Sequence, residues 1–309
     1  MSDVLAVTRE QYAQRQLLAR RALLATRKAW SQLDPTAIRA TWHASVGPAV
    51  LAITSGAQIE AASTADANAN AALAAQGVTA PPVAAVNAAA LAGIASDGRD
   101  LASLLELSNL YALRAIQQGQ TAKQGLAIGG RWLEMAVGQQ VVDASRVARE
   151  VATTTRTGIG GYYRVLNPPS CARCIVLAGV WYRWNAGFAR HPQCDCSQVE
   201  AHEGALDDTI STPEKVFGSL SHPEQNRIFT AAGAESIRSG ADIGQVVNAR
   251  RGMYTAGGRR LTHSAARLYG QGGVRLMPEQ IWKEAHGNRD EAIRLLSRFG
   301  YIRQEDTNG

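Results

Sequence analysis

The 309-residue sequence lacks the hydrophobic segments of a membrane-spanning or secreted protein. Its longest stretch without a charged residue, from Ala67 to Ser96, has the length of a membrane helix. However, it is rich in alanine, contains three asparagines and is broken by Pro81-Pro82. The first residues, MSDVLAVTREQ, have no basic segment followed by an apolar one, so we expect no secretory signal. We therefore predict a cytoplasmic protein with no membrane partner.

Common catalytic and nucleotide-binding motifs are also missing. The sequence has neither a G-x-x-x-x-G-K-[ST] loop nor a G-x-G-x-x-G turn between a strand and a helix, which leaves nucleotide binding without support. No G-x-S-x-G elbow surrounds any serine. We therefore predict no catalytic residues. The composition, with 46% apolar and 19% charged residues, is that of a folded globular chain.

The net charge is small, with 32 Lys and Arg against 26 Asp and Glu, and the surplus of basic residues lies between Arg227 and Arg303. Paired arginines in a glycine-containing stretch can follow the phosphates of nucleic acid. The candidate DNA-binding residues are Arg250, Arg251, Arg259 and Arg260. A solvated arginine-rich surface explains them equally well.

Hydrophobic spacing predicts an all-α domain over residues 1–157. A basic amphipathic helix is expected from Thr8 to about Leu33, and Asp34-Pro35 is expected to start a second helix that runs toward residue 60. The alanine-rich residues 61–90 predict two weakly packed helices separated near Gly77 and Pro81-Pro82. Two further helices are predicted over residues 100–118 and 121–156.

Residues 158–309 predict a second, mixed domain. Residues 162–166 and 180–184 have the β-branched and aromatic content of two strands that form a small ribbon. Capping boxes predict helix starts at Ser211 and Ser221, the second helix ending at Gly233, and further helices are expected over 277–282 and 288–299. The expected class is α+β, mainly α: a long N-terminal helical region followed by a small β-ribbon domain like a zinc knuckle, with flanking helices.

All four cysteines fall between residues 171 and 196, where a histidine joins them. The pattern is Cys171-x-x-Cys174, then 16 residues, then His191-Pro-x-Cys194-x-Cys196. A two-residue gap lets two cysteines on one turn bind the same ion, and zinc takes four thiolate or imidazole ligands in a tetrahedron. We therefore predict a structural zinc site with five candidate ligands for four positions.

Two other interpretations of this cluster remain open. Reduced cysteines pack well as small hydrophobic residues, so the cluster is also consistent with a metal-free core. Alternatively, Cys171 or Cys194 is a nucleophile and His191 its base, although four thiols so close together suit a metal better than one nucleophile.

The string PPSCARCIVLAGVWYRW followed by HPQCDC resembles the cysteine-rich core of the MuF-like minor head proteins of tailed bacteriophages. The matching positions are Cys171, Cys174, His191, Pro192, Cys194 and Cys196. The phrases AESIRSGADIGQVVNARRGM and RLMPEQIWKEA, with GYI near the end, are similar to the actinobacteriophage branch of that family.

The resemblance implies a minor capsid or head-morphogenesis protein that associates with the portal and with the major capsid protein, and that contacts packaged DNA. Its expected location is the host cytoplasm during assembly and then the interior of the capsid. Some members of this branch are named capsid maturation proteases, or carry a protease fused to the MuF-like part. A protease that acts on the major capsid protein is therefore the alternative function.

Overall fold

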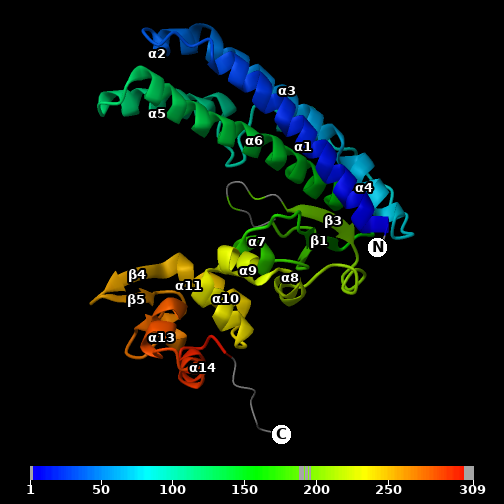
Figure 1. Cartoon of the computed structure of the whole chain (residues 1–309). Helices are drawn as coiled ribbons and strands as arrows, with labels where there is room; N and C mark the ends of the chain where they lie inside the picture. The colour runs from blue at the N-terminus through cyan, green and yellow to red at the C-terminus, as the bar shows by residue number, and fades with distance from the viewer. Residues whose placement is uncertain (1–2, 188–190, 192–193, 195, 303–309) are drawn as a thin grey trace. The chain divides into compact units, whose positions relative to one another are not determined.

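The computed structural model of the chain describes residues 3–187, 191, 194 and 196–302 (Figure 1). Helices dominate it, and the strands of the described part form two small antiparallel sheets. The predicted α+β, mainly α class is confirmed. The contacts divide the chain into two compact units, one of Met1–Asn167 and Trp181–Thr209 and one of Pro168–Val180 and Ile210–Gly309. The division at residue 157 stays a prediction.

The regular elements in the N-terminal part of the first unit are helices, as predicted. Figure 1 shows its long helices α1, α3, α5 and α6 running side by side. The elements are α1 (Asp3–Trp30), α2 (Ile38–Thr41), the π-turn η1 (Trp42–Val46), α3 (Gly47–Ser63), α4 (Ala65–Ala74), the 3₁₀ turn η2 (Ala88–Leu91), α5 (Leu101–Gln117) and α6 (Ala122–Thr154).

Helix caps fix where the last two of these helices begin. The Asp100 side chain accepts a hydrogen bond from the Ser103 amide at 3.0 Å, which caps α5. Thr121 and Gln124 form a reciprocal capping box at the start of α6. Both starts agree with the sequence prediction.

Two helix predictions in this region are wrong. Asp34 caps no helix, because its carboxylate accepts hydrogen bonds from the amide and hydroxyl of Thr36 at 2.8 and 2.7 Å and closes a turn. The helix begins at Ile38 instead. The second alanine-rich helix is only the 3₁₀ turn η2. After the two prolines, the amides of Val83 and Val86 donate to Thr155 and Asp66 rather than to a helix of their own.

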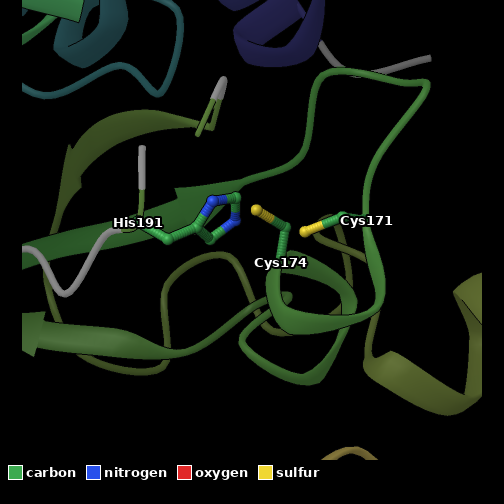
Figure 2. Close-up of side chains that lie close together, drawn as sticks. All are labelled: Cys171, Cys174 and His191. Carbon is green, nitrogen blue, oxygen red and sulfur yellow. The ribbon is translucent and has the colours of Figure 1, made fainter. Parts of the chain in front are cut away.

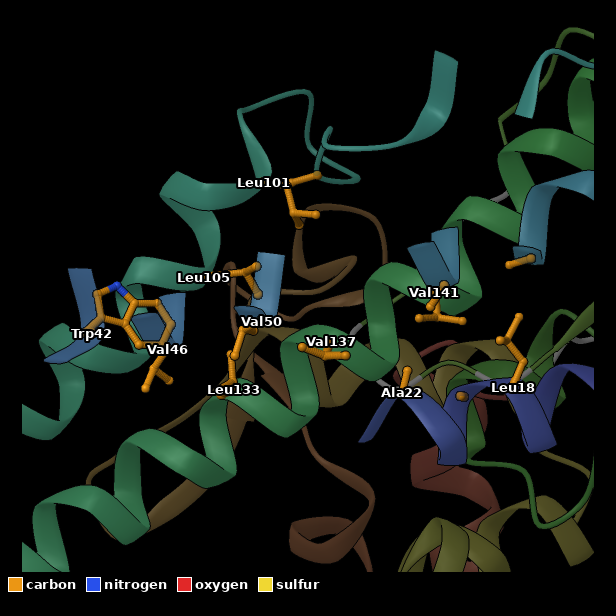
Figure 3. Close-up of a cluster of buried hydrophobic side chains, with 14 of the residues drawn as sticks. Leu18, Ala22, Trp42, Val46, Val50, Leu101, Leu105, Leu133, Val137 and Val141 are labelled. Atoms are coloured by element: carbon orange, nitrogen blue, oxygen red, sulfur yellow. The ribbon is translucent and has the colours of Figure 1, made fainter. Parts of the chain in front are cut away.

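The core of the first unit lies between α1, α3, α5 and α6 (Figure 3). Leu133, Val137 and Val141 form a fully buried stripe along α6, at four-residue spacing. The alanine-rich α4 is tightly packed rather than weakly packed, since Ala65 and Ala69 are buried against Ala148 and Ala152 of α6. Small side chains let these helices approach closely, as the composition indicates.

A three-stranded antiparallel sheet completes the first unit. Its strands are β1 (Gly161–Val165), β2 (Trp181–Arg183) and β3 (Ser197–Ala201), in the order β2-β1-β3. The sequence predicted β1 and β2 but missed β3, in which all five residues are buried. A strand that is buried on both faces does not alternate polar and apolar residues, so its periodicity gives no signal.

The outer edge of β3 is covered by side chains from the helices. The carbonyl of Cys196 accepts from Arg146 at 2.9 Å, that of Gln198 from Arg149 at 3.5 Å and that of Glu200 from Gln76 at 2.8 Å. These alternate carbonyls are the acceptors that an added strand would need. The edge of this sheet is therefore closed to strand pairing.

The second unit consists of short helices around another small sheet, with strand order β4-β5-β6. The sequence predicted none of these three strands. Its elements are α7 (Ala172–Val176), α8 (Pro213–Ser219), α9 (His222–Phe229), α10 (Ala231–Arg238), α11 (Ile243–Ala249), η3 (Arg250–Gly252), β4 (Met253–Ala256), β5 (Arg259–Thr262), α12 (Ala266–Tyr269), β6 (Arg275–Leu276), α13 (Pro278–Glu284) and α14 (Arg289–Arg298).

The predicted helix starts of this unit are mostly correct. Ser221 and Glu224 form the expected capping box of α9. Thr212 rather than Ser211 caps α8, because its side chain accepts from the amide of Lys215. The prediction that α9 ends at Gly233 is wrong: Thr230 has a φ of 68°, which ends α9 at Phe229 and caps α10.

None of the helices in the described part of the chain combines the length and the apolar character that crossing a bilayer requires.

Candidate metal centre

The first two candidate ligands lie on the short helix α7. Cys171 is its N-cap residue, and the Cys171 carbonyl accepts from the amide of Ile175 at 3.0 Å. Cys174 lies three residues further on, inside the helix. Because residues three apart share one face of a helix, the C-x-x-C spacing presents both thiols on the same side. Cys171 is exposed and Cys174 is buried.

The other candidates, His191, Cys194 and Cys196, come shortly before β3 in the sequence. The Cys194 amide donates a hydrogen bond to the His191 carbonyl at 3.0 Å, which holds these two residues close together. Cys194 and Cys196 are 2% and 1% exposed. Pro192, which belongs to the same motif, lies outside the described residues.

The structure brings the five predicted residues together in two overlapping groups. In one group, the Sγ atoms of Cys171 and Cys174 and a ring nitrogen of His191 lie within 4.8 Å of one another, and their side chains point toward one another (Figure 2). In the other, the same limit holds for the Sγ atoms of Cys174, Cys194 and Cys196. Thiolates around one zinc ion are about 3.8 Å apart, given zinc–sulfur distances of about 2.3 Å in a tetrahedron.

The cluster can therefore hold a metal ion, and Cys174 is the residue common to both groups. The burial of Cys194 and Cys196 also fits the metal-free interpretation, in which reduced thiols pack as small apolar groups. Of the two candidate nucleophiles, Cys171 fits the structure better than Cys194. Cys171 is exposed and is grouped with His191, whereas Cys194 is not grouped with that histidine.

Arg146 supports the cysteine segment and was missed by the sequence prediction. Its guanidinium is 1% exposed and donates to the carbonyls of Cys194 and Cys196 at 2.5 and 2.9 Å. Asp143, one turn earlier on α6, forms an ion pair with it at 3.2 Å. The arginine thus fixes the backbone that carries two candidate ligands, and it brings positive charge near thiols that would have to ionise to bind a metal.

The sequence contains a signal for the neighbouring buried arginine, Arg149, although not for Arg146 itself. The buried stripe of α6 runs through Leu133, Val137 and Val141 at four-residue spacing, and the same spacing continues to Arg149. An arginine on the apolar face of a long helix indicates a buried charge with dedicated partners.

Tyr182 on β2 lies beside the same segment. Burial raises the pKa of its phenol above the ordinary 10.0, Arg164 lowers it, and Cys196 and Cys194 raise it. The Arg164 guanidinium lies 5.7 Å from the centre of the Tyr182 ring, which also stacks on Tyr162 with centroids 5.6 Å apart. The rings of Tyr162 on β1 and Tyr182 on β2 therefore cover the sheet near the cysteines.

The four arginines predicted to bind DNA lie on η3 and β5 in the second unit, and all are exposed. Two are engaged with carboxylates: Arg250 pairs with Glu279, and Arg259 pairs with Glu284 at 2.7 Å. Ion pairing reduces the positive charge available to phosphates. DNA binding stays a prediction, with Arg251 and Arg260 as its stronger candidates.

Comparisons with known proteins give no relative: no family model matches the chain, and no curated protein or solved structure is significantly similar to it. The resemblance to MuF-like proteins remains an expectation that rests on the motif residues.

Proposed function

We propose that this chain is a structural protein of tailed-phage heads, a MuF-like minor capsid or head-morphogenesis protein whose cysteine cluster binds zinc. The observation that carries the proposal is the convergence of the cysteine and histidine side chains of the motif into one cluster. The resemblance depends on those same residues, so it gains support from their being brought together.

The donor set favours zinc over other metals. Thiolate and imidazole ligands suit zinc, whereas calcium and magnesium prefer oxygen ligands. A four-coordinate site closed by protein ligands is structural, because it leaves no position for water or substrate. Five candidates for four positions are enough to close the site.

The helical N-terminal half supports a role in assembly. Long helices such as α1, α5 and α6 offer extended surfaces for partner helices. We propose the portal protein and the major capsid protein as partners, packaged DNA as a contact of the second unit, and the capsid interior as the final location.

Metal analysis tests the zinc site. We expect elemental mass spectrometry of the purified chain to find one zinc per chain. Cys174→Ala should lose the metal and destabilise the chain by on the order of several kcal/mol, because a structural ion contributes folding free energy. His202→Ala is the matched control, since His202 is exposed and outside the cluster. Unchanged metal content and thermal unfolding of Cys174→Ala would contradict the site.

Incubation with the major capsid protein from the same phage separates the structural role from the protease. Intact capsid protein, together with co-sedimentation of the chain with portal oligomers, supports the proposal. A defined cleavage that disappears in Cys171→Ser would instead identify a maturation protease with a cysteine nucleophile. Failure to co-sediment with the portal would count against the assembly role.

A further inference from the structure

The sheet of the second unit has an open edge, unlike the closed edge of β3. Strand β4 lies at the end of the order β4-β5-β6, so β5 is its one neighbour among the described strands. Figure 1 shows β4 and β5 side by side as a hairpin. Three of the four β4 residues, Met253, Thr255 and Ala256, are exposed. An uncovered edge strand can pair with an extended segment of another protein.

The turn of this hairpin shows which backbone groups face the open edge. β4 and β5 are joined by Gly257 and Gly258, whose φ values of 55° and 72° are those of a two-residue hairpin turn. Such a turn is closed by a hydrogen-bonded pair, and bonded and non-bonded pairs alternate along the ladder. The backbones of Ala256 and Tyr254 therefore face β5, whereas Thr255 turns its amide and carbonyl away from it.

Hydrogen bonds on both sides of the hairpin agree with this register. The His263 amide donates to the Gly252 carbonyl at 2.9 Å, which continues the bonded pairs at two-residue spacing. Arg260, opposite Thr255, accepts at its carbonyl from the Met277 amide at 3.0 Å, so its backbone faces away from β4. The outward position of the Thr255 backbone therefore follows from two separate observations.

Three backbone groups are left for a partner at the β4 edge. They are the amide and carbonyl of Thr255 and the carbonyl of Met253. The Met253 amide is not among them, because it donates to the Arg250 carbonyl at the end of η3. One donor and two acceptors in this arrangement match the backbone of an added antiparallel strand.

Positive charge lies near this edge without a carboxylate to balance it. Arg251 precedes β4, and Arg260 lies opposite Thr255 on β5; both arginines are exposed, and within the described part of the chain neither pairs with a carboxylate. Glu279 and Glu284 are already paired with other arginines. Thr255 and Arg260 form a non-hydrogen-bonded pair, so their side chains lie close together on one face. A carboxylate on an added strand would reach Arg260 across the short Thr255 side chain.

We propose that the β4 edge binds an extended acidic segment of a partner protein, which joins the sheet as an antiparallel strand beside β4. An acidic residue of the segment lies opposite Thr255, on the face of Arg260. An apolar residue two positions away packs on Met253, which is 49% exposed and lies on the same face. The proposal depends neither on the metal centre nor on the phage role.

Two other occupants fit the β4 edge less well. The phosphates of nucleic acid offer acceptors only, so they cannot pair with the carbonyls of Met253 and Thr255. A second copy of this chain, paired through β4, would bring the unbalanced arginines of both copies together, and like charges destabilise a strand pair. An acidic peptide backbone satisfies both the edge groups and the charge.

A designed peptide tests the proposal on the full chain. The probe is a capped, fluorescent peptide of sequence TVTETVT, whose glutamate is designed to lie opposite Thr255. We expect fluorescence anisotropy to show one site per chain, with binding that weakens as salt is added. N-methylation of the valine and glutamate amides keeps the side chains and the charge but removes the donors to β4. It should therefore weaken binding by about tenfold or more.

Three variants of the chain locate the site. Arg260→Gln should weaken binding by about two- to fivefold and reduce its salt dependence, as expected for an exposed ion pair. Arg259→Gln is the matched control and should leave binding unchanged, because Arg259 is on the opposite face of β5 and pairs with Glu284 at 2.7 Å. Thr255→Pro removes the outward amide and should abolish binding. Thermal unfolding shows whether each variant keeps the fold, and the N-methylated probe requires no variant.

Hydrogen exchange of single amides is the second readout. The Thr255 amide should exchange freely in the chain alone and slowly with the peptide bound, whereas the Met253 amide, which already has a partner, should change little. The proposal is overturned if the peptide does not bind, if the N-methylated probe binds as tightly, or if the Thr255 amide gains no protection at saturation. Binding of duplex DNA that requires Arg260, without binding of the peptide, would overturn it in favour of a nucleic-acid surface.

Discussion

The two units bury arginine side chains in different ways. In the first unit, Arg149 is held by a carboxylate: its Nε donates to Glu200 at 2.6 Å, a second guanidinium nitrogen pairs with the other carboxylate oxygen, and Glu200 itself is 0% exposed. Gln11 accepts a further hydrogen bond from Arg149 at 2.9 Å. This pair is bidentate and buried, so each charge depends on the other.

In the second unit, Arg275 is equally buried but has a different environment. Among the described residues no carboxylate pairs with it; it donates to the carbonyls of Phe299 and Ser264 at 2.8 and 2.9 Å. Its guanidinium also lies 4.0 Å from the centre of the Tyr301 ring. Burial lowers the pKa of Arg275 below its ordinary value.

The difference teaches that a buried guanidinium needs its donors satisfied more than it needs a countercharge. In the second unit, backbone carbonyls accept hydrogen bonds from the Arg275 guanidinium, and the Tyr301 ring stabilises its charge. The two arrangements should respond differently to mutation, because removing Arg149 leaves a buried anion behind, whereas removing Arg275 leaves only neutral acceptors.

The largest expected effect is that of Arg149→Met. It should destabilise the first unit by about 3–5 kcal/mol, since Glu200 remains buried and unpaired. Adding Glu200→Gln should restore a large part of that loss. Hydrogen exchange of residues 197–201 measures the change locally, and a double variant as unstable as the single one would contradict the charge argument.

Arg275→Met should cost less, about 2–3 kcal/mol, because it leaves buried carbonyls without donors but no unpaired charge. Exchange of residues 295–301 reports this loss. If Arg275→Met lowers the free energy of unfolding as much as Arg149→Met does, the distinction between a carboxylate-paired and a carbonyl-bound arginine is wrong.

Gly129→Ala tests how closely the helices of the first unit pack against one another. We expect it to lower the free energy of unfolding by about 1–2 kcal/mol. A Cβ at Gly129 would lie 2.4 Å from the Ser108 carbonyl oxygen and 3.0 Å from the Trp30 ring. Gly138→Ala on the same helix meets only Leu23 at 3.9 Å, so it should be neutral or slightly stabilising. Urea unfolding of both variants tests this; equal costs would exclude a steric role for Gly129.

The smallest effect is that of Tyr301→Phe, about 1 kcal/mol at neutral pH, from the lost hydrogen bond to the Leu276 carbonyl at 2.8 Å. Burial raises the pKa of Tyr301 above the ordinary 10.0. The folded state therefore keeps a proton that the unfolded chain loses near pH 10, so the stabilisation is full below pH 10 and falls as the pH rises further.

Tyr301→Phe should consequently flatten the alkaline loss of stability in the second unit. Exchange of residues 295–301 between pH 9 and 11 provides the measurement, in the unmodified chain and in the variant. Parallel pH profiles for the two proteins would show that another group controls the alkaline transition.

Much of the fold follows from local sequence. Asp100, the Thr121–Gln124 box and the Ser221–Glu224 box fix helix starts through hydrogen bonds that span only three residues. Such signals are complete within a short window, so they can be recognised without knowledge of the tertiary structure. The same holds for Cys171 and Cys174, whose spacing places both on one face of a turn.

Other features depend on residues far apart in the chain. The helix expected after Pro82 is lost because the Val83 and Val86 amides find acceptors on Thr155 and Asp66. Strand β3 is recognisable only beside β1, and Arg146 becomes a support of the cysteine segment only once α6 lies against it. Long-range hydrogen bonds override local preference because a buried backbone group must find a partner wherever one is available.

The sequence by itself determined the mainly helical class, most helix starts and the identity of the five candidate metal ligands. Only the tertiary structure decided that Cys174 is common to both candidate ligand groups, and that Arg250 and Arg259 are engaged with carboxylates. The physical reason is that capping and spacing act within one turn, whereas burial and charge pairing are set by segments that meet only in the folded chain.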